Sequence, residues 1–127
     1  MDGVEIIELE LVKKQERGSI FQFENRDSSK LILVKRKKGT VSGAHYHTGK
    51  SPMKDPETVV FLDGEFELIL KNVKTKEESK QTYNRPIMFK LAPFIYHKIV
   101  ALTDIVLLDM NSIDDDKDDT IKGDSVE

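Results

Sequence analysis

The chain has 127 residues, of which 38% are hydrophobic and 34% are charged, and its formal net charge is −3. This length suits one domain with its own core, and no apolar run approaches the length of a membrane-spanning helix. The absence of cysteine excludes disulfides, thiolate metal sites and cysteine nucleophiles. The acidic N-terminus lacks a basic region followed by an apolar stretch, so we expect no secretory signal, a cytoplasmic location and no membrane partner.

The charge is distributed unevenly along the chain. Residues 114–127 contain seven acidic residues and two lysines, a net charge of −5, whereas residues 1–113 carry +2. A nearly neutral body has no electrostatic footprint for nucleic acid. The acidic segment has too few apolar groups to form a core, so we predict a disordered acidic tail over 114–127 and one folded domain over 1–113.

Apolar and polar residues alternate with a period of two, which is typical of strands that bury one face. The predicted strands, in chain order, are 7–11, 20–23, 31–36, 40–47, 57–62, 65–70, 87–91, 97–102 and 105–110. Polar residues 25–29 predict a hairpin between the second and third strands, and residues 72–80 predict another exposed hairpin tip. Asp63-Gly64 predicts a tight hairpin turn, because this pair readily takes positive φ angles. With no helical periodicity, the pattern predicts an all-β sandwich or closed barrel.

Three histidines and one glutamate are the candidate site residues. His45 and His47 are two positions apart in a predicted strand, so their side chains lie on the same face of the sheet. Glu57 begins a strand whose inward face is otherwise apolar, where a carboxylate needs a partner or a metal ion. His97 begins another apolar strand. Three imidazoles and one carboxylate suit Fe, Mn, Ni, Cu or Zn, although structural histidines and a solvated glutamate would give the same pattern.

The stretch from Gly39 to Gly64 resembles the first sequence motif of the cupin superfamily. That motif is a glycine, five residues, His-x-His, a spacer, a glutamate, six residues and a glycine. Here five residues separate Gly39 from His45, His47 completes the pair, and six residues separate Glu57 from Gly64. The spacer between His47 and Glu57 holds nine residues, which is longer than is usual in the family.

The resemblance implies a small RmlC-like jelly-roll (double-stranded β-helix) barrel with a divalent metal ion near its wider mouth. The family's metal ligands map onto His45, His47 and Glu57. The second cupin motif supplies a further histidine, and His97 is the remaining candidate for it. The resemblance also implies a small oxygen-rich ligand or substrate and, often, a homodimer.

Three functions remain open at this point. The first is a metal-binding cupin, such as a dioxygenase or isomerase, that acts on or binds a small oxygen-rich molecule. The second is a metal-independent epimerase or isomerase of nucleotide-linked sugars, because residues 97–104 resemble segments of cupins with that activity. In such an enzyme His47 or His97 would be the base, and Lys50 and Lys54 of the loop 48–56 would bind a phosphate. The alternative is that this loop is only a solvated rim. The third is a non-catalytic small-molecule-binding module.

The quaternary structure is predicted from sheet edges as well as from the resemblance. The first strand and residues 105–110 have the pattern of exposed edge strands. Exposed edges are templates for pairing with another chain. Such edges would allow strand exchange between subunits, and we expect a homodimer.

Overall fold

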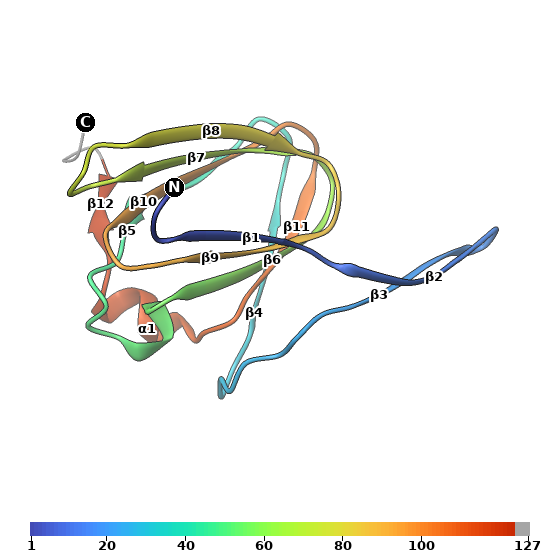
Figure 1. Ribbon diagram of the computed structural model, residues 1–127, viewed down its shortest axis with the longest axis horizontal. Coiled ribbons are helices and arrows are strands. Elements are labelled where there is room, and N and C mark those ends of the chain that lie inside the picture. Colours follow the sequence, from blue (N-terminus) through green and yellow to red (C-terminus); the bar gives the residue numbers. More distant parts are fainter. Residues whose placement is uncertain (124–127) are drawn as a thin grey trace.

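The structure is a computed structural model that describes residues 1–123, and these form mainly strands (Figure 1). The elements are β1 Val4–Glu8, β2 Glu10–Gln15, β3 Gly18–Gln22, β4 Ile32–Arg36, β5 Val41–Tyr46, the 3-10 helix η1 Pro52–Lys54, β6 Glu57–Asp63, β7 Phe66–Asn72, β8 Glu78–Tyr83, β9 Ile87–Leu91, β10 Ile95–Ala101, β11 Ile105–Asp109, α1 Ile113–Asp118 and β12 Ile121–Lys122. In this part of the chain, no helix is long and apolar enough to span a bilayer.

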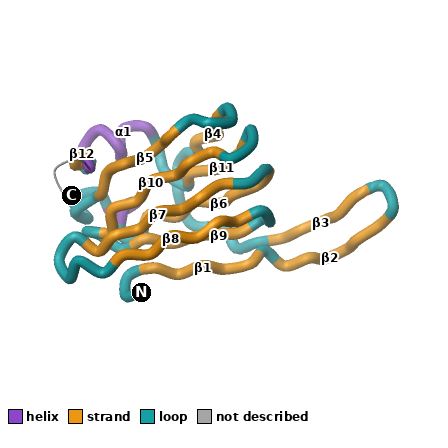
Figure 2. Tube along the Cα trace, turned by 90° about the horizontal axis from the view of Figure 1, so that it is seen from above, coloured by secondary structure: helices purple, strands orange, loops and turns teal. Residues whose placement is uncertain are grey.

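Two antiparallel sheets face each other across the core (Figures 1 and 2). One has the strand order β1-β9-β6-β11-β4 and the other β12-β5-β10-β7-β8, with five strands in each. Alternation directs every second side chain inward, so Phe61, Phe66 and Phe89 meet in the centre of the core. This all-β jelly-roll confirms the predicted fold class.

A second apolar cluster lies on the opposite, outer side of the first sheet. Val60 of β6 and Met88 of β9 face outward there and are buried with Leu9 and Met110. Because β6 is covered on both faces, its residues Glu57–Phe61 are all buried. The first residue of β6 is therefore fixed inside the molecule rather than at a solvated strand end.

The Asp63-Gly64 turn forms, but it does not close a hairpin. Strands β6 and β7 belong to different sheets, so the turn carries the chain from one sheet to the other. Gly64 has a φ of +102°, and a Cβ at this position would clash with the backbone carbonyl oxygen of Asp104. The prediction of a tight turn is correct and that of a hairpin is wrong, because turn chemistry fixes local φ angles and not the partner of the next strand.

Two other turn predictions have opposite outcomes. Strands β7 and β8 pair as the hairpin predicted around residues 72–80. The hairpin predicted at residues 25–29 is wrong, because β3 pairs with β2 and β4 pairs with β11. Of the two predicted edge strands, β1 is an edge, whereas β11 lies between β6 and β4.

The prediction of a disordered tail over residues 114–127 is wrong for residues 114–123. These residues include most of α1 and the short strand β12, which pairs with β5. The Asp115 carboxylate accepts a hydrogen bond from the Ser112 backbone N–H at 2.9 Å and so caps the helix. The segment is ordered by contacts with the barrel, which its own lack of apolar residues does not reveal. Residues 124–127 lie outside the described residues.

Gly64 gives a direct test of the turn between the sheets. We expect Gly64→Ala to lower the free energy of unfolding by about 2–4 kcal/mol, since it adds a clash to the cost of a left-handed backbone. Gly39 is the matched control, because it has a φ of +86° and open space around the added Cβ. Gly39→Ala should cost only about 1–2 kcal/mol in urea denaturation. Equal losses for the two variants would contradict the proposed clash.

Candidate functional site

The four predicted site residues meet at one end of the barrel. His45, the last residue but one of β5, lies beside His97 of β10 in direct register, and His47 follows β5. The centroids of the three imidazole rings lie 4.7–5.3 Å apart. Glu57, the first residue of β6, reaches the same point from the facing sheet. The structure therefore brings the four predicted site residues together.

An irregularity in β5 lets the strand approach β10 closely at this point. Gly43 has a φ of +77°, and a Cβ there would come within 2.8 Å of the His97 carbonyl oxygen. The register between the two strands shifts between His97 and Lys98. A bulge of this kind re-aims side chains next to it, here the imidazoles of His45 and His97.

The Glu57 carboxylate is the centre of the cluster. Its Oε2 lies 2.9 Å from His47 Nε2, and its Oε1 lies 3.1 Å from His97 Nε2. The Nζ atom of Lys54 is 2.5 Å from Oε2. Glu57 is only 3% exposed, so these three groups replace the water that a carboxylate needs.

Lys54 is the residue that the sequence analysis placed wrongly. Its side chain is fully buried at 0% exposure, whereas both alternatives considered from the sequence, a phosphate-binding lysine and a solvated rim, required it to be accessible. Besides Glu57, its ammonium contacts Asp116 at 2.5 Å, the amide oxygen of Asn111 at 3.0 Å and Asp109 at 3.9 Å. Burial opposes the charged form, but the carboxylates outweigh it and leave the pKa of Lys54 raised. This lysine is a structural cation and is not available to a phosphate.

The backbone fixes the tautomers of two histidines. Nδ1 of His47 bonds to the carbonyl oxygen of Asp119, and Nδ1 of His97 bonds to that of Ile95 at 3.1 Å. Because a carbonyl only accepts, both Nδ1 atoms carry the hydrogen. In the neutral rings, each Nε2 therefore presents a lone pair to an oxygen of Glu57.

Two facing acceptors repel unless a positive charge lies between them. That charge is either a proton on a ring nitrogen or a metal cation. Nε2 of His47 is buried and makes no directed hydrogen bond to any described residue, although a Glu57 oxygen lies only 2.9 Å away. This orphaned nitrogen shows that the donor set fits a metal ion.

The pKa values of His45 and His97 are shifted in opposite directions. Burial lowers the pKa of His97, but the Glu57 carboxylate more than compensates and leaves it raised. Burial also raises the pKa of Glu57, yet His97, His47 and Lys54 hold it well below its usual value. Burial, together with His97 and His47, lowers the pKa of His45 to about 3. His45 is therefore uncharged at neutral pH, while the raised pKa of His97 favours its charged form beside Glu57.

The acidic C-terminal segment closes this end of the barrel. The Asp119 carboxylate accepts hydrogen bonds from the backbone N–H groups of Thr48, Gly49 and Ser51 and from the Thr48 hydroxyl, at 2.7–3.2 Å. Asp115 accepts another bond from the Ser51 hydroxyl at 2.6 Å. The segment thus fixes the loop after His47 as well as the His47 ring. The Ser112-x-x-Asp115 spacing, a capping pattern, was the available sequence signal for this helix.

Access to the cluster is uneven. His47, Glu57 and His97 are each only 3% exposed, whereas His45 is partly exposed. A small molecule that enters the site would therefore meet His45 first.

Comparisons with known proteins support the same fold. No family model and no curated protein matches the chain. A double mutant of the QdtA 3,4-ketoisomerase from Thermoanaerobacterium thermosaccharolyticum, in complex with TDP, matches with a TM-score of 0.77 and 21% identity over 98% of this chain and 91% of that chain. The WlaRB TDP-quinovose 3,4-ketoisomerase from Campylobacter jejuni matches with a TM-score of 0.68 and 20% identity over 87% and 85%.

A third match is the dTDP-4-dehydrorhamnose 3,5-epimerase from Sulfolobus tokodaii, with a TM-score of 0.68 and 17% identity over 87% of this chain and 70% of that chain. The fold is that of an RmlC-like cupin. The predicted resemblance is thereby confirmed at the level of the fold. The metal-ligand role of His45, His47, Glu57 and His97 stays a prediction. One nitrogen from each of the three histidines lies within 4.8 Å of the others, a spacing at which these atoms can share one cation.

The buried charge of Lys54 gives the second test. We expect Lys54→Met to lower the free energy of unfolding by about 3–5 kcal/mol, because it leaves Glu57 and Asp116 without their shared cation. Lys50, an exposed residue of the same loop, is the matched control. Lys50→Met should change the stability by no more than about 0.5 kcal/mol. Chemical denaturation of the two variants measures the difference, and equal stability would show that Lys54 does not neutralise the site.

Proposed function

We propose that this protein is an isomerase or epimerase of a nucleotide-linked keto sugar and acts by proton transfer next to the sugar's carbonyl group. The observation that most directly supports this proposal is a buried cluster of three histidines and one carboxylate at the end of a cupin barrel. Of these four side chains, only His45 is partly exposed. Support comes from solved structures of the same fold, which include a ketoisomerase in complex with TDP-4-keto-6-deoxyglucose. This proposal takes up the second function considered from the sequence.

The chemistry of such a reaction needs acid and base groups only. A base removes the proton from the carbon beside the carbonyl, and the resulting enediolate takes a proton back. Return of the proton to the former carbonyl carbon, together with transfer of the hydroxyl proton from one oxygen to the other, moves the ketone. Return to the opposite face of the original carbon inverts that centre. Electrons are redistributed within the sugar, so no external oxidant or reductant is required. Positioned acid–base groups contribute rate factors of about 10²–10⁴.

His45 is the best-placed base. Both ring nitrogens of His47 and His97 face backbone carbonyls or Glu57, so these two rings are less suited to the role than the sequence suggested. His45 is partly exposed and uncharged, with its pKa lowered to about 3. A nucleotide diphosphate bound nearby would bring negative charge and raise that pKa, which makes His45 a stronger base when substrate is present. The paired His97 and Glu57 hold the cluster in place behind it.

The test is exchange of a substrate proton with solvent. We expect the protein to incorporate deuterium from D₂O into TDP-4-keto-6-deoxyglucose next to the carbonyl, as followed by NMR. His45→Asn should slow this at least about 100-fold, because it removes the base. Tyr46→Phe is the matched control, since the Tyr46 ring lies beside Phe94, with centroids 6.0 Å apart.

Two results would count against this function. Sugar binding without any exchange in the wild-type protein would favour the non-catalytic binding module. If the protein shows no exchange and also no thermal shift with a panel of TDP-linked keto sugars, this substrate class is ruled out. A ligand that binds only the folded state must raise the melting temperature, so the thermal shift is an independent readout.

A metal-dependent form of the same centre is the second candidate, favoured by the orphaned Nε2 of His47. His45, His47, Glu57 and His97 would hold a divalent Fe, Mn, Ni, Zn or Cu ion. When bound, such an ion polarises a substrate carbonyl or activates water or dioxygen. The residues of this chain would then orient the sugar, and Lys54 would keep Glu57 ionised.

Metal binding is tested separately from turnover. If this candidate is correct, the purified protein contains or takes up one equivalent of Zn²⁺ or Ni²⁺ by elemental analysis and calorimetry. His47→Ala should weaken that binding at least about tenfold, because it removes one ligand, whereas Tyr46→Phe should not. Circular dichroism verifies that both variants are folded. A metal-free protein that takes up neither ion would remove this candidate and leave the proton-transfer function standing.

A further inference from the structure

The Lys54 ammonium lies in a shell of oxygen atoms from four side chains. Its Nζ atom is 2.5 Å from Oε2 of Glu57, 2.5 Å from Oδ1 of Asp116 and 3.0 Å from the amide oxygen of Asn111. Oδ2 of Asp109 follows at 3.9 Å. Carboxylate and amide oxygens are the ligands that hard divalent cations take in proteins. The lysine therefore ends where the donor set suits a metal ion.

This shell holds more acceptor oxygen than one ammonium satisfies. An ammonium has three N–H donors, and the three nearest oxygens take them. Oδ1 of Asp109 is buried and has no hydrogen-bond partner among the described residues. Burial, together with the neighbouring Glu57 carboxylate, raises the pKa of Asp109 to about 8, so the shell is short of positive charge. A Ca²⁺ ion, which takes about six to eight oxygen ligands, would use the shell more fully.

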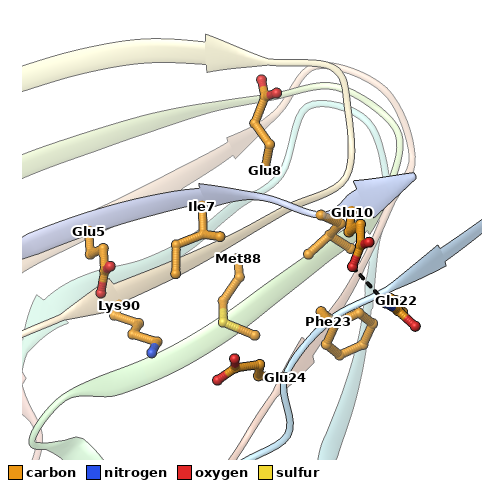
Figure 3. Close-up of a pocket in the computed structure, with 10 residues that line it drawn as sticks. Glu5, Ile7, Glu8, Glu10, Gln22, Phe23, Glu24, Met88 and Lys90 are labelled. Carbon is orange, nitrogen blue, oxygen red and sulfur yellow. Dashed lines mark hydrogen bonds between the residues drawn. The ribbon is translucent and has the colours of Figure 1, made fainter. Parts of the chain in front are cut away.

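Another group of carboxylates shows why burial matters. An open groove of about 380 Å³ beside β1 and β9 is lined by the side chains of Glu5, Glu8, Glu10 and Glu24 (Figure 3). All four residues are exposed, so water solvates their charges without a cation. Around Lys54 this is not possible, because Lys54 and Asn111 are 0% exposed and Glu57 is 3% exposed.

We propose that the Lys54 ammonium is a tethered replacement for a divalent cation, in a site formed by Glu57, Asp116 and Asn111. The three shortest distances from Nζ are near the Ca²⁺–oxygen distances of about 2.3–2.6 Å. The site differs from the three-histidine group, in which Asp116 and Asn111 have no part. The Asp116 side chain is 34% exposed and gives an ion a path from solvent.

The tethered cation deepens the proposed function, and this one step rests on it. Oε2 of Glu57, which contacts Nζ of Lys54, also lies 2.9 Å from Nε2 of His47. A divalent ion bound by His47 and Glu57 would lie beside the ammonium, and like charges a few Å apart in a buried site repel strongly. Lys54 thus keeps Glu57 ionised without a metal ion, which suits a proton-transfer enzyme. The tests below measure cation binding and not turnover, so their failure is distinct from failure of the proposed function.

Removal of the tethered cation should open the site to a free ion. Lys54→Ala should bind one equivalent of Ca²⁺ in calorimetry, with a dissociation constant at least about tenfold below that of the wild-type protein. Ca²⁺ should also raise the melting temperature of this variant by at least about 5 °C, since it binds only the folded state. Ca²⁺ is the probe because it prefers oxygen to imidazole and so does not report on the histidines. If the variant is unfolded in EDTA, recovery of its circular dichroism spectrum in Ca²⁺ is the equivalent readout.

Three further variants locate the ion. Lys54→Met fills the space with an apolar side chain and should gain no Ca²⁺ binding. Adding Asp116→Asn to Lys54→Ala should weaken Ca²⁺ binding at least about tenfold, because it removes a charged ligand. Adding Asp114→Asn instead is the matched control, since Asp114 is an exposed residue of the same helix and should not affect binding.

Several results would overturn the proposal. One is a wild-type protein that binds Ca²⁺ as tightly as Lys54→Ala. Another is a Lys54→Ala variant that Ca²⁺ neither binds, stabilises nor refolds. Equal responses of Lys54→Ala and Lys54→Met, or equal effects of the two aspartate changes, would show that Ca²⁺ binds elsewhere.

Discussion

The Glu57 carboxylate and its three partners are the interaction on which the site depends. Transfer of an ionised carboxylate into a protein interior costs several kcal/mol, and only well-directed opposite charges and hydrogen bonds offset that cost. Lys54, His47 and His97 provide them from three different segments of the chain. The cluster therefore forms only when the barrel has closed and the loop before β6 has folded against it.

The same charge network explains why the C-terminal segment is ordered. The Lys54 ammonium that pairs with Glu57 also lies 2.5 Å from a carboxylate oxygen of Asp116 in α1. Three residues after Asp116, the Asp119 carboxylate accepts hydrogen bonds from backbone N–H groups of the loop after His47. This segment has almost no apolar side chains, so it is held by ion pairs and hydrogen bonds rather than by burial of apolar surface. Its position also determines which nitrogen of His47 faces the site.

The sequence predicted the features that follow from the order of neighbouring residues. Alternation identified the strands, and the spacing of His45, His47 and Glu57 anticipated their convergence, because side-chain direction in a strand repeats every two residues. The same reasoning missed Lys54, since a lysine in a polar loop looks solvated until its distant carboxylates are known. It missed residues 114–123 for the same reason, because the loop residues that bind them lie 64 and 70 residues earlier in the chain.

The two candidate functions use one geometric fact in different ways. The backbone carbonyls of Asp119 and Ile95 force the lone pairs of His47 and His97 toward Glu57, and some cation must relieve the resulting repulsion. A proton on His97 does so in the proton-transfer enzyme, and a divalent ion would do so in the metal form. Because metal ligands must be deprotonated, the two solutions exclude each other at the same nitrogen. His45 distinguishes the two states. In the proton-transfer form it stays available to a substrate, since no oxygen of Glu57 is paired with it among the described contacts, whereas in the metal form it would be one of the ligands.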